Sequence, residues 1–200
     1  MSERRARVLI LCGPSGSGKS RLAERLHRSY GWPIVRLDDF YKDGDDPSLA
    51  MSSLGIPDWD VVGSWNIDAA FAALQDLCTT GRTVVPDYDI STSRAAGHST
   101  VELASADTVV AEGIFAADLI ALLRDADLLR DAFCVRQNRW VTMGRRFVRD
   151  VSERRKSVPV LARRGLRLAM DEPRIVAAHV RRGARAVTPK QAEREVRVGA

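Results

Sequence analysis

The stretch Gly13–Ser20 has the residue types and the spacing of a phosphate-binding loop. It reads Gly-Pro-Ser-Gly-Ser-Gly-Lys-Ser and fits the pattern Gly-x-x-x-x-Gly-Lys-[Ser/Thr]. In such a loop the backbone N–H groups surround phosphate oxygens, the lysine reaches the β- and γ-phosphates, and the last hydroxyl ligates Mg²⁺. The residues in these positions are Gly13, Ser15, Gly16, Ser17, Gly18, Lys19 and Ser20. The sequence therefore predicts a site for ATP and Mg²⁺ and does not identify the acceptor.

The segments around this loop alternate between two patterns. Apolar runs typical of strands occur at 7–12, 34–37, 108–111 and 132–135, and helically spaced segments occur at 22–27, 67–79 and 117–123. Strands that alternate with helices predict an α/β fold of three layers, a mostly parallel sheet with helices on both faces. Two short runs, 83–86 and 100–103, predict a small β-hairpin within this fold.

The C-terminal part of the chain is predicted to be mainly helical. Helix candidates are the Arg-rich segment 140–151 and the segments 159–168 and 173–182. Thr188 and Gln191 have the spacing of a capping box, with Pro189 at the first helical position, and would begin a last helix.

Composition limits the class of protein. The chain has 200 residues, 45% of them hydrophobic, and no apolar run of the length that spans a bilayer, so we expect a cytoplasmic protein without membrane contact. Its formal net charge is +5, with arginines concentrated between Arg136 and Arg185. Nucleic acid could bind there, but few aromatic residues accompany the arginines, and small-molecule phosphates explain them as well.

The three cysteines are widely spaced and lie within apolar segments. We expect Cys12, Cys78 and Cys134 to be reduced thiols of the core, neither metal ligands nor disulfides.

Carboxylates follow two of the predicted strands. Asp38 and Asp39 come after the run 34–37, and Glu112 comes directly after 108–111. In open α/β sheets the carboxyl ends of the strands form the ligand crevice. Asp38 could accept the proton of an acceptor hydroxyl and contact the water shell of Mg²⁺. Glu112 could be the second acidic residue of the metal's coordination sphere. The alternatives are an Asp pair that caps a turn and a glutamate that faces solvent.

Four arginines, at 145, 146, 149 and 154, lie on or just beyond one predicted helix. Like charges this close repel one another, so the cluster is unfavourable without an anion. Guanidinium groups bind phosphate in a bidentate manner, which favours a lid over the triphosphate. The alternative is a solvated helix face paired with Asp150 and Glu153.

Taken in order, these motifs resemble the uridine kinase family and its wider group with phosphoribulokinase and bacterial pantothenate kinase. The resemblance runs from about Val8 to Lys156. Its segments are the phosphate-binding loop, Asp38–Tyr41, Pro57–Asp60 with Ser64 and Trp65, Pro86–Asp89 with Arg94, Glu112–Ile114, and Arg145–Arg154.

The resemblance implies a role for each matched residue. Asp38 would be the general base on a ribose 5′-hydroxyl, assisted in catalysis by Lys19 and Arg149. The acceptor would be bound by Asp38, Tyr41, Asp60, Tyr88, Thr92 and Arg94. Ser20, Glu112 and Asp38 would hold Mg²⁺, and Arg146, Arg149 and Arg154 would grip phosphates. The resemblance also implies one domain over residues 1–200, with acceptor-binding insertions at about 42–66 and 83–103 and a lid at about 140–157.

The sequence departs from the family pattern on the acceptor side. The hairpin segment 88–94 has no histidine where the family reads the pyrimidine; Thr92 stands near that position, and His98 lies nearby. Residues 61–63 replace a common His-Pro, and Arg155-Lys156 replaces Gly-Arg. The resemblance implies an ATP-dependent kinase for a nucleoside, uridine or cytidine. A kinase for another small alcohol, such as a sugar or a pantothenate-like acceptor, and a non-catalytic nucleotide-binding regulator stay open, as does a homo-oligomer.

Overall fold

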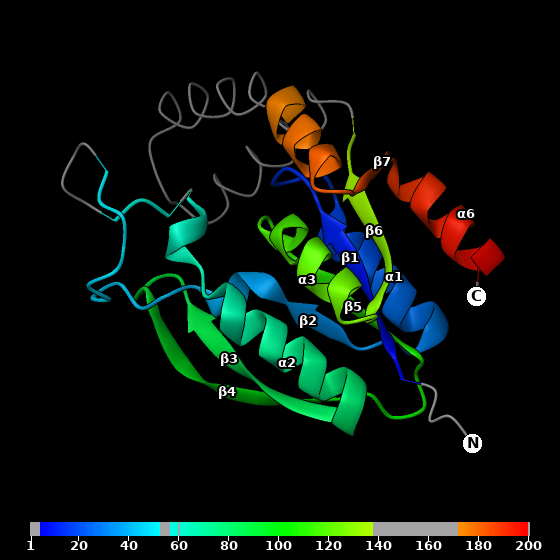
Figure 1. Ribbon diagram of the computed structural model, residues 1–200, viewed down its shortest axis with the longest axis horizontal. Helices are drawn as coiled ribbons and strands as arrows, with labels where there is room; N and C mark the ends of the chain where they lie inside the picture. Colours follow the sequence, from blue (N-terminus) through cyan, green and yellow to red (C-terminus); the bar gives the residue numbers. More distant parts are fainter. Residues whose placement is uncertain (1–4, 53–56, 60, 138–171, 200) are drawn as a thin grey trace.

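The computed structural model of the chain describes residues 5–52, 57–59, 61–137 and 172–199. Five strands form one sheet in the order β2-β5-β1-β6-β7, and every neighbouring pair is parallel (Figure 1). The strands are β1 Arg7–Cys12, β2 Ile34–Arg36, β5 Thr108–Glu112, β6 Leu129–Val135 and β7 Arg185–Val187. The strand that leads into the phosphate-binding loop is therefore the central one.

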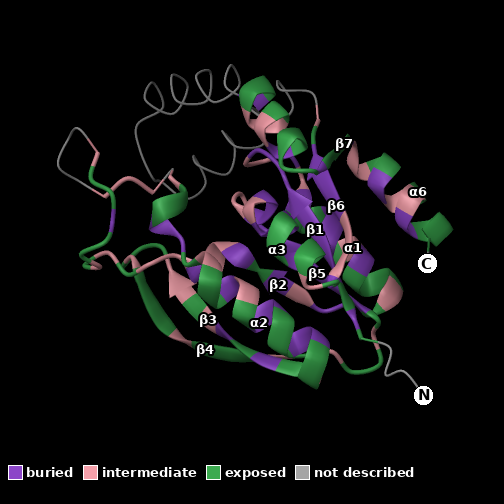
Figure 2. Ribbon diagram, viewed as in Figure 1, coloured by how far each residue is buried: buried purple, intermediate pink, exposed green. Residues whose placement is uncertain are grey.

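Helices cover both faces of this sheet, as the sequence predicts. The α-helices with defined bounds are α1 Lys19–Tyr30, α2 Ile67–Thr80, α3 Ile120–Asp125 and α6 Pro189–Gly199; residues 172–181 are also helical. Alternate residues of β1 point to opposite faces: Leu9 joins the apolar cluster with α1 and α6, and Ile10 joins the cluster with α2 and α3. Figure 2 shows the buried strands between exposed outer helix faces. The predicted three-layer fold is confirmed.

The predicted hairpin is present and longer than expected. Strands β3 Arg82–Asp89 and β4 Arg94–Glu102 pair antiparallel as a sheet of their own, beside α2 (Figure 1). Its outer residues are largely polar, so apolar runs alone underestimated its length. The hairpin carries Tyr88, which therefore lies on a different sheet from the strand that leads into the phosphate-binding loop.

Local capping signals define several helix ends. The Asn66 side chain accepts a hydrogen bond from the Ala69 N–H at 3.1 Å, and α2 ends at Gly81 with φ +82°. Thr188 and Gln191 form the predicted capping box, in which the Gln191 N–H donates to the Thr188 hydroxyl at 3.3 Å. Such short-range patterns are readable from sequence because both partners lie within one turn.

Two elements differ from the expectation. The helix predicted at 117–123 is a 3₁₀ turn, Ala116–Leu119, followed by α3. Strand β7 was not predicted, because it has three residues and an exposed Arg185 and gains its pairing only from β6. The expected helices 140–151 and 159–168 lie outside the described residues. Among the described helices, none has the length and apolar character required to cross a membrane.

Candidate active site

The loop Gly13–Ser20 connects β1 to α1 in a conformation that depends on its glycines. Gly13, Gly16 and Gly18 have φ values of +133°, +77° and +100°, a region that residues with a side chain rarely adopt. A Cβ atom on Gly13 would lie 2.4 Å from the Val135 carbonyl oxygen. The loop is thus packed closely against the end of β6, and its shape is fixed by the fold.

Lys19 lies across this loop. Its Nζ donates hydrogen bonds to the carbonyl oxygens of Gly13 at 3.0 Å and Pro14 at 3.3 Å. Burial lowers the pKa of Lys19, and the nearby carboxylates Asp38 and Glu112 oppose this effect. Lys19 is therefore buried among the groups that the sequence assigned to phosphate and metal.

The loop also fits a phosphate group. The Ser17 hydroxyl is buried and has no hydrogen-bond partner within the described parts of the chain, and Lys19 lies two residues further along the same loop. Helix α1 begins at Lys19 with no side-chain cap, so its first N–H groups have no side-chain acceptor. A buried hydroxyl, unsatisfied N–H groups and a cation form a donor set that suits an oxyanion.

Asp38 and Glu112 come together at the carboxyl ends of the neighbouring strands β2 and β5. Asp38 Oδ1 accepts a hydrogen bond from the Ile114 N–H at 3.0 Å, which orients the carboxylate. Residue 113 must be small for this contact, because a Cβ there would lie 2.9 Å from Asp38 Oδ1 and 2.9 Å from Leu37 Cβ. The Glu-Gly-Ile segment therefore positions Asp38 as well as contributing its own carboxylate.

Glu112 is buried beside the loop. Burial raises the pKa of its carboxyl group; the charge of Lys19 lowers it, that of Asp38 raises it, and a hydrogen bond with Ser20 lowers it. The groups that would hold a metal ion, Ser20 and Glu112 with Asp38 nearby, thus interact with one another. The predicted grouping of these three residues with Lys19 is observed.

Asp39 has a perturbed environment that the sequence did not reveal. Burial raises the pKa of its carboxyl group to about 6; Arg36 lowers it, and Asp38 and Asp87 raise it. Such a shift depends on tertiary burial, and no local pattern announces it.

An aromatic cluster lies next to these carboxylates. The Tyr41 ring is 5.8 Å from the rings of Trp59 and Tyr88 and 6.1 Å from that of Phe115, measured between centroids. The Tyr88 hydroxyl donates to the Lys42 carbonyl oxygen at 3.0 Å. The structure therefore brings together Tyr41 and Tyr88, both assigned to the acceptor. Trp59 and Phe115 were not assigned, although each stands within or directly after a matched segment.

Other predicted acceptor residues lie at the end of the hairpin. Arg94 forms an exposed ion pair with Asp45 at 2.6 Å, and the Thr92 hydroxyl donates to the Asp89 carbonyl oxygen at 3.4 Å within the turn. Their roles toward an acceptor stay predictions. Asp60, Arg146, Arg149 and Arg154 lie outside the described residues, and so does the predicted lid.

A cleft of about 1050 Å³ opens between α2, the hairpin and the segment after Phe40. Tyr41 and His98 line it, whereas Asp38, Glu112 and the phosphate-binding loop do not. Of the predicted site residues that the structure describes, Tyr41 alone lines this cleft.

The fold and the phosphate-binding loop together define the class of protein. A glycine loop between a central parallel strand and a helix, with carboxylates at the neighbouring strand end, is the arrangement of α/β P-loop proteins of the kinase type. A family model described as AAA domain matches residues 8–111, more than half of the chain. The chain belongs to this family.

Curated relatives refine the relationship. The chain is 28% identical to uridine kinase of Saccharomyces cerevisiae (strain ATCC 204508 / S288c) over 150 residues, which are 74% of this chain and 29% of the relative. It is 26% identical to uridine kinase of Schizosaccharomyces pombe (strain 972 / ATCC 24843) over 160 residues, 78% of this chain and 34% of the relative. The chain spans about a third of the length of these relatives. They confirm the resemblance to uridine kinases that the motifs indicate.

Solved structures support the fold. A protein of Silicibacter sp. TM1040, provisionally described as a fructose transport system kinase, superposes with a TM-score of 0.65 at 17% identity, over 94% of this chain and 90% of that one. A protein of Bacillus stearothermophilus, provisionally described as a uridine kinase, gives a TM-score of 0.52 at 20% identity, over 76% and 83%. At these identities the likeness concerns architecture.

Proposed function

We propose that this protein is an ATP- and Mg²⁺-dependent kinase that phosphorylates the 5′-hydroxyl of a nucleoside, uridine or cytidine. The observation that carries the proposal is the position of Asp38, held by Ile114 beside Lys19, Glu112 and the aromatic cluster. This position supports the proposal of a donor site and an acceptor surface on either side of one carboxylate.

The donor side of the proposal rests on the loop. ATP would supply the phosphoryl group, and Mg²⁺ would neutralise negative charge on it. The residues that would hold them are the loop Gly13–Ser20 with Lys19 for phosphates, and Ser20 and Glu112 for the metal. Arg146, Arg149 and Arg154 are proposed to close over the phosphates.

The acceptor side rests on Asp38. Its Oδ1 atom is engaged by the Ile114 N–H, so we assign the second oxygen, Oδ2, to the acceptor hydroxyl. There it accepts the hydroxyl proton as the acceptor oxygen attacks phosphorus. Because the carboxylate is fixed by the backbone, its orientation is established before the acceptor binds, which lowers the entropic part of the barrier.

The aromatic cluster supports a planar acceptor. Tyr41, Trp59, Tyr88 and Phe115 present ring faces and edges within one group, and a nucleobase stacks favourably on such rings. Asp60 is proposed to bind ribose hydroxyls, and Thr92 and Arg94 to complete the acceptor site.

The test is ADP release with a panel of acceptors, namely uridine, cytidine, pantothenate and fructose, together with two variants. Lys19→Ala and Asp38→Asn should each lose most turnover, the latter by at least about 100-fold while keeping ATP affinity. The exposed Asp125→Asn serves as the matched control and should keep full turnover. Full activity of Asp38→Asn would contradict the assignment of the base.

A second function differs only in the acceptor. The hairpin segment 88–94 has no histidine to read a pyrimidine, which favours another small alcohol. ADP release with fructose or pantothenate, and none with uridine or cytidine, would establish this alternative.

Stoichiometric ATP binding without ADP release on any acceptor would instead indicate a nucleotide-binding regulator.

A further inference from the structure

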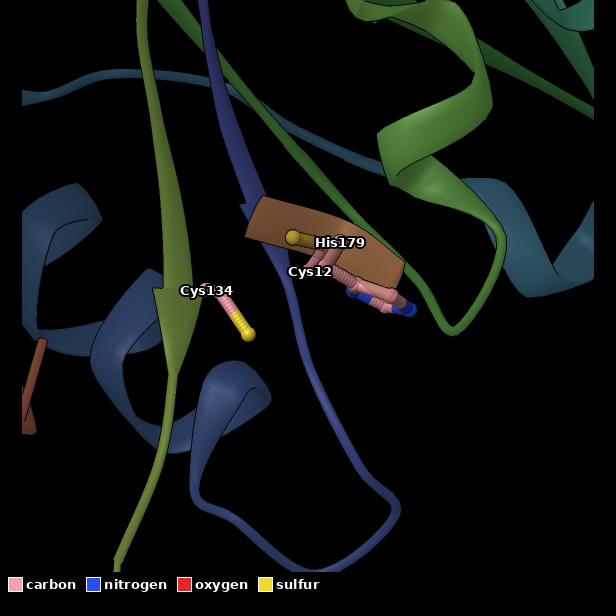
Figure 3. A group of neighbouring side chains, drawn as sticks. All are labelled: Cys12, Cys134 and His179. Carbon is pink, nitrogen blue, oxygen red and sulfur yellow. The ribbon is translucent and has the colours of Figure 1, made fainter. Parts of the chain in front are cut away.

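Two cysteines and a histidine meet directly below the phosphate-binding loop. Cys12 ends β1, Cys134 is its register partner on β6, and His179 lies on the helical residues 172–181 (Figure 3). The sulfur atoms and a ring nitrogen all lie within 4.8 Å of one another. Both cysteines are fully buried, and His179 is 8% exposed.

The histidine has an unsatisfied polar atom. His179 Nδ1 is buried and has no hydrogen-bond partner among the residues that the structure describes. Buried polar atoms are nearly always paired, so the unpaired Nδ1 atom indicates a missing partner for this histidine, which also has a ring nitrogen within 4.8 Å of both sulfur atoms. Imidazole and thiolate groups share one class of partner, a soft or borderline metal cation.

The third cysteine provides a contrast within the same core. Cys78 is buried in α2, and burial alone raises the pKa of its thiol to about 11, as expected for an inert core residue. Cys12 and Cys134, by contrast, are register partners on neighbouring strands and have a ring nitrogen of His179 within 4.8 Å. All three cysteines are free and buried, as the sequence predicts. What the sequence did not reveal is that Cys12 and Cys134 lie together with a histidine.

We propose that Cys12, Cys134 and His179 bind one thiophilic cation of the Zn²⁺ class. Zn²⁺ takes thiolate sulfur at about 2.3 Å and imidazole nitrogen at about 2.0–2.1 Å, so its tetrahedral ligand atoms lie roughly 3.5–4 Å apart. This separation falls within the 4.8 Å over which the three atoms are grouped. Two thiolates balance the charge of a divalent ion, and their two protons are released on binding. A water molecule would complete four-fold coordination.

This site is separate from the proposed Mg²⁺ site. Mg²⁺ takes hard oxygen ligands, which Ser20 and Glu112 supply, whereas the cluster offers sulfur and nitrogen. A bound ion would join β1, β6 and the helical residues 172–181, and Cys12 directly precedes Gly13 of the loop. The ion would thereby hold that helix against the base of the phosphate-binding loop.

The experiment is metal titration of the reduced 200-residue chain. Zn²⁺ is measured by competition with a chromophoric chelator, and Co²⁺ is used as a spectroscopic probe of thiolate ligation. We expect one ion per chain, with sulfur-to-cobalt charge-transfer absorption. Cys12→Ser, Cys134→Ser and His179→Ala should each weaken Zn²⁺ binding by more than about 100-fold, since changes outside the ligands themselves already cost about 10–100-fold.

Cys78→Ser is the matched control, a buried cysteine outside the cluster, and should keep full affinity. Near-UV circular dichroism of each variant identifies any loss of folding, and His179→Gln gives a milder second change at the same ligand. Absence of Zn²⁺ and Co²⁺ binding to the reduced protein would overturn the proposal, as would equal weakening by Cys78→Ser. None of these readouts depends on kinase activity.

Discussion

Gly113 is the residue whose substitution tests the site most directly. Its backbone is not in the left-handed region, so Gly113→Ala adds only a methyl group. That Cβ would lie 2.9 Å from both Asp38 Oδ1 and Leu37 Cβ. Since ordinary contacts begin at 3.4 Å, the carboxylate or the strand end must move by about 0.5 Å. Leu37 is 1% exposed and closely packed, so we expect the Asp38 carboxylate to move.

The close packing at residue 113 determines how much Gly113→Ala should change stability and turnover. Overpacking at a buried position costs about 1–3 kcal/mol, so the free energy of unfolding in urea should fall by that amount. A misplacement of about 1 Å can cost about 100-fold in rate, so turnover should fall by about 10- to 100-fold for this smaller shift. ATP affinity should stay near that of the parent protein, because the three atoms nearest the added Cβ belong to Leu37 and Asp38 and none belongs to the loop Gly13–Ser20.

A matched control is Gly199→Ala, since a Cβ at Gly199 meets no atom within 4 Å. It should leave both stability and turnover unchanged. Were Gly113→Ala to match the parent protein in stability and in ADP release, Asp38 would not be fixed by close packing against residue 113. If stability fell while turnover did not, Asp38 would not be the base.

Two further predictions concern the surroundings of the carboxylates. The folded-state pKa of Asp39, about 6, exceeds its ordinary value of 3.8, so this group stabilises the fold below about pH 4 and the effect is lost as the pH rises through 6. Asp39→Asn should therefore raise the free energy of unfolding at pH 7–8 but not at pH 4, and parallel stability curves from pH 4 to 8 would contradict this. Tyr88→Phe removes the hydrogen bond to the Lys42 carbonyl oxygen and should cost about 0.5–1.5 kcal/mol in urea unfolding. It should also raise KM for the acceptor more than KM for ATP; an unchanged acceptor KM would remove Tyr88 from the acceptor site.

Much of the donor site is encoded locally. The loop Gly13–Ser20, the strand before it and the helix after it are contiguous, so their residue types and spacing are sufficient to predict them. The same holds for the Asn66 cap and for the capping box of Thr188 and Gln191, where partners lie three residues apart. Strand β7 could not be predicted, since its three residues are a strand only by pairing with β6.

The acceptor side depends on contacts between distant segments. Tyr41, Trp59, Tyr88 and Phe115 belong to four separate parts of the chain, and only the fold shows that their rings are neighbours. The perturbed pKa of Asp39 is likewise a consequence of burial, which one sequence does not display.

The sequence by itself determined the class of protein, because a phosphate-binding loop is a short-range device whose glycines, lysine and serine must stand in fixed order. The tertiary structure decided which groups meet around it. The bond from Ile114 to Asp38 joins residues 76 positions apart. In the sequence nothing connects Cys12, Cys134 and His179. The parallel pairing of β1 with β6, together with the helix beside these strands, places the two sulfur atoms and a ring nitrogen within 4.8 Å of one another. The sequence specifies the chemistry of each side chain, but proximity between distant residues follows from strand order and packing.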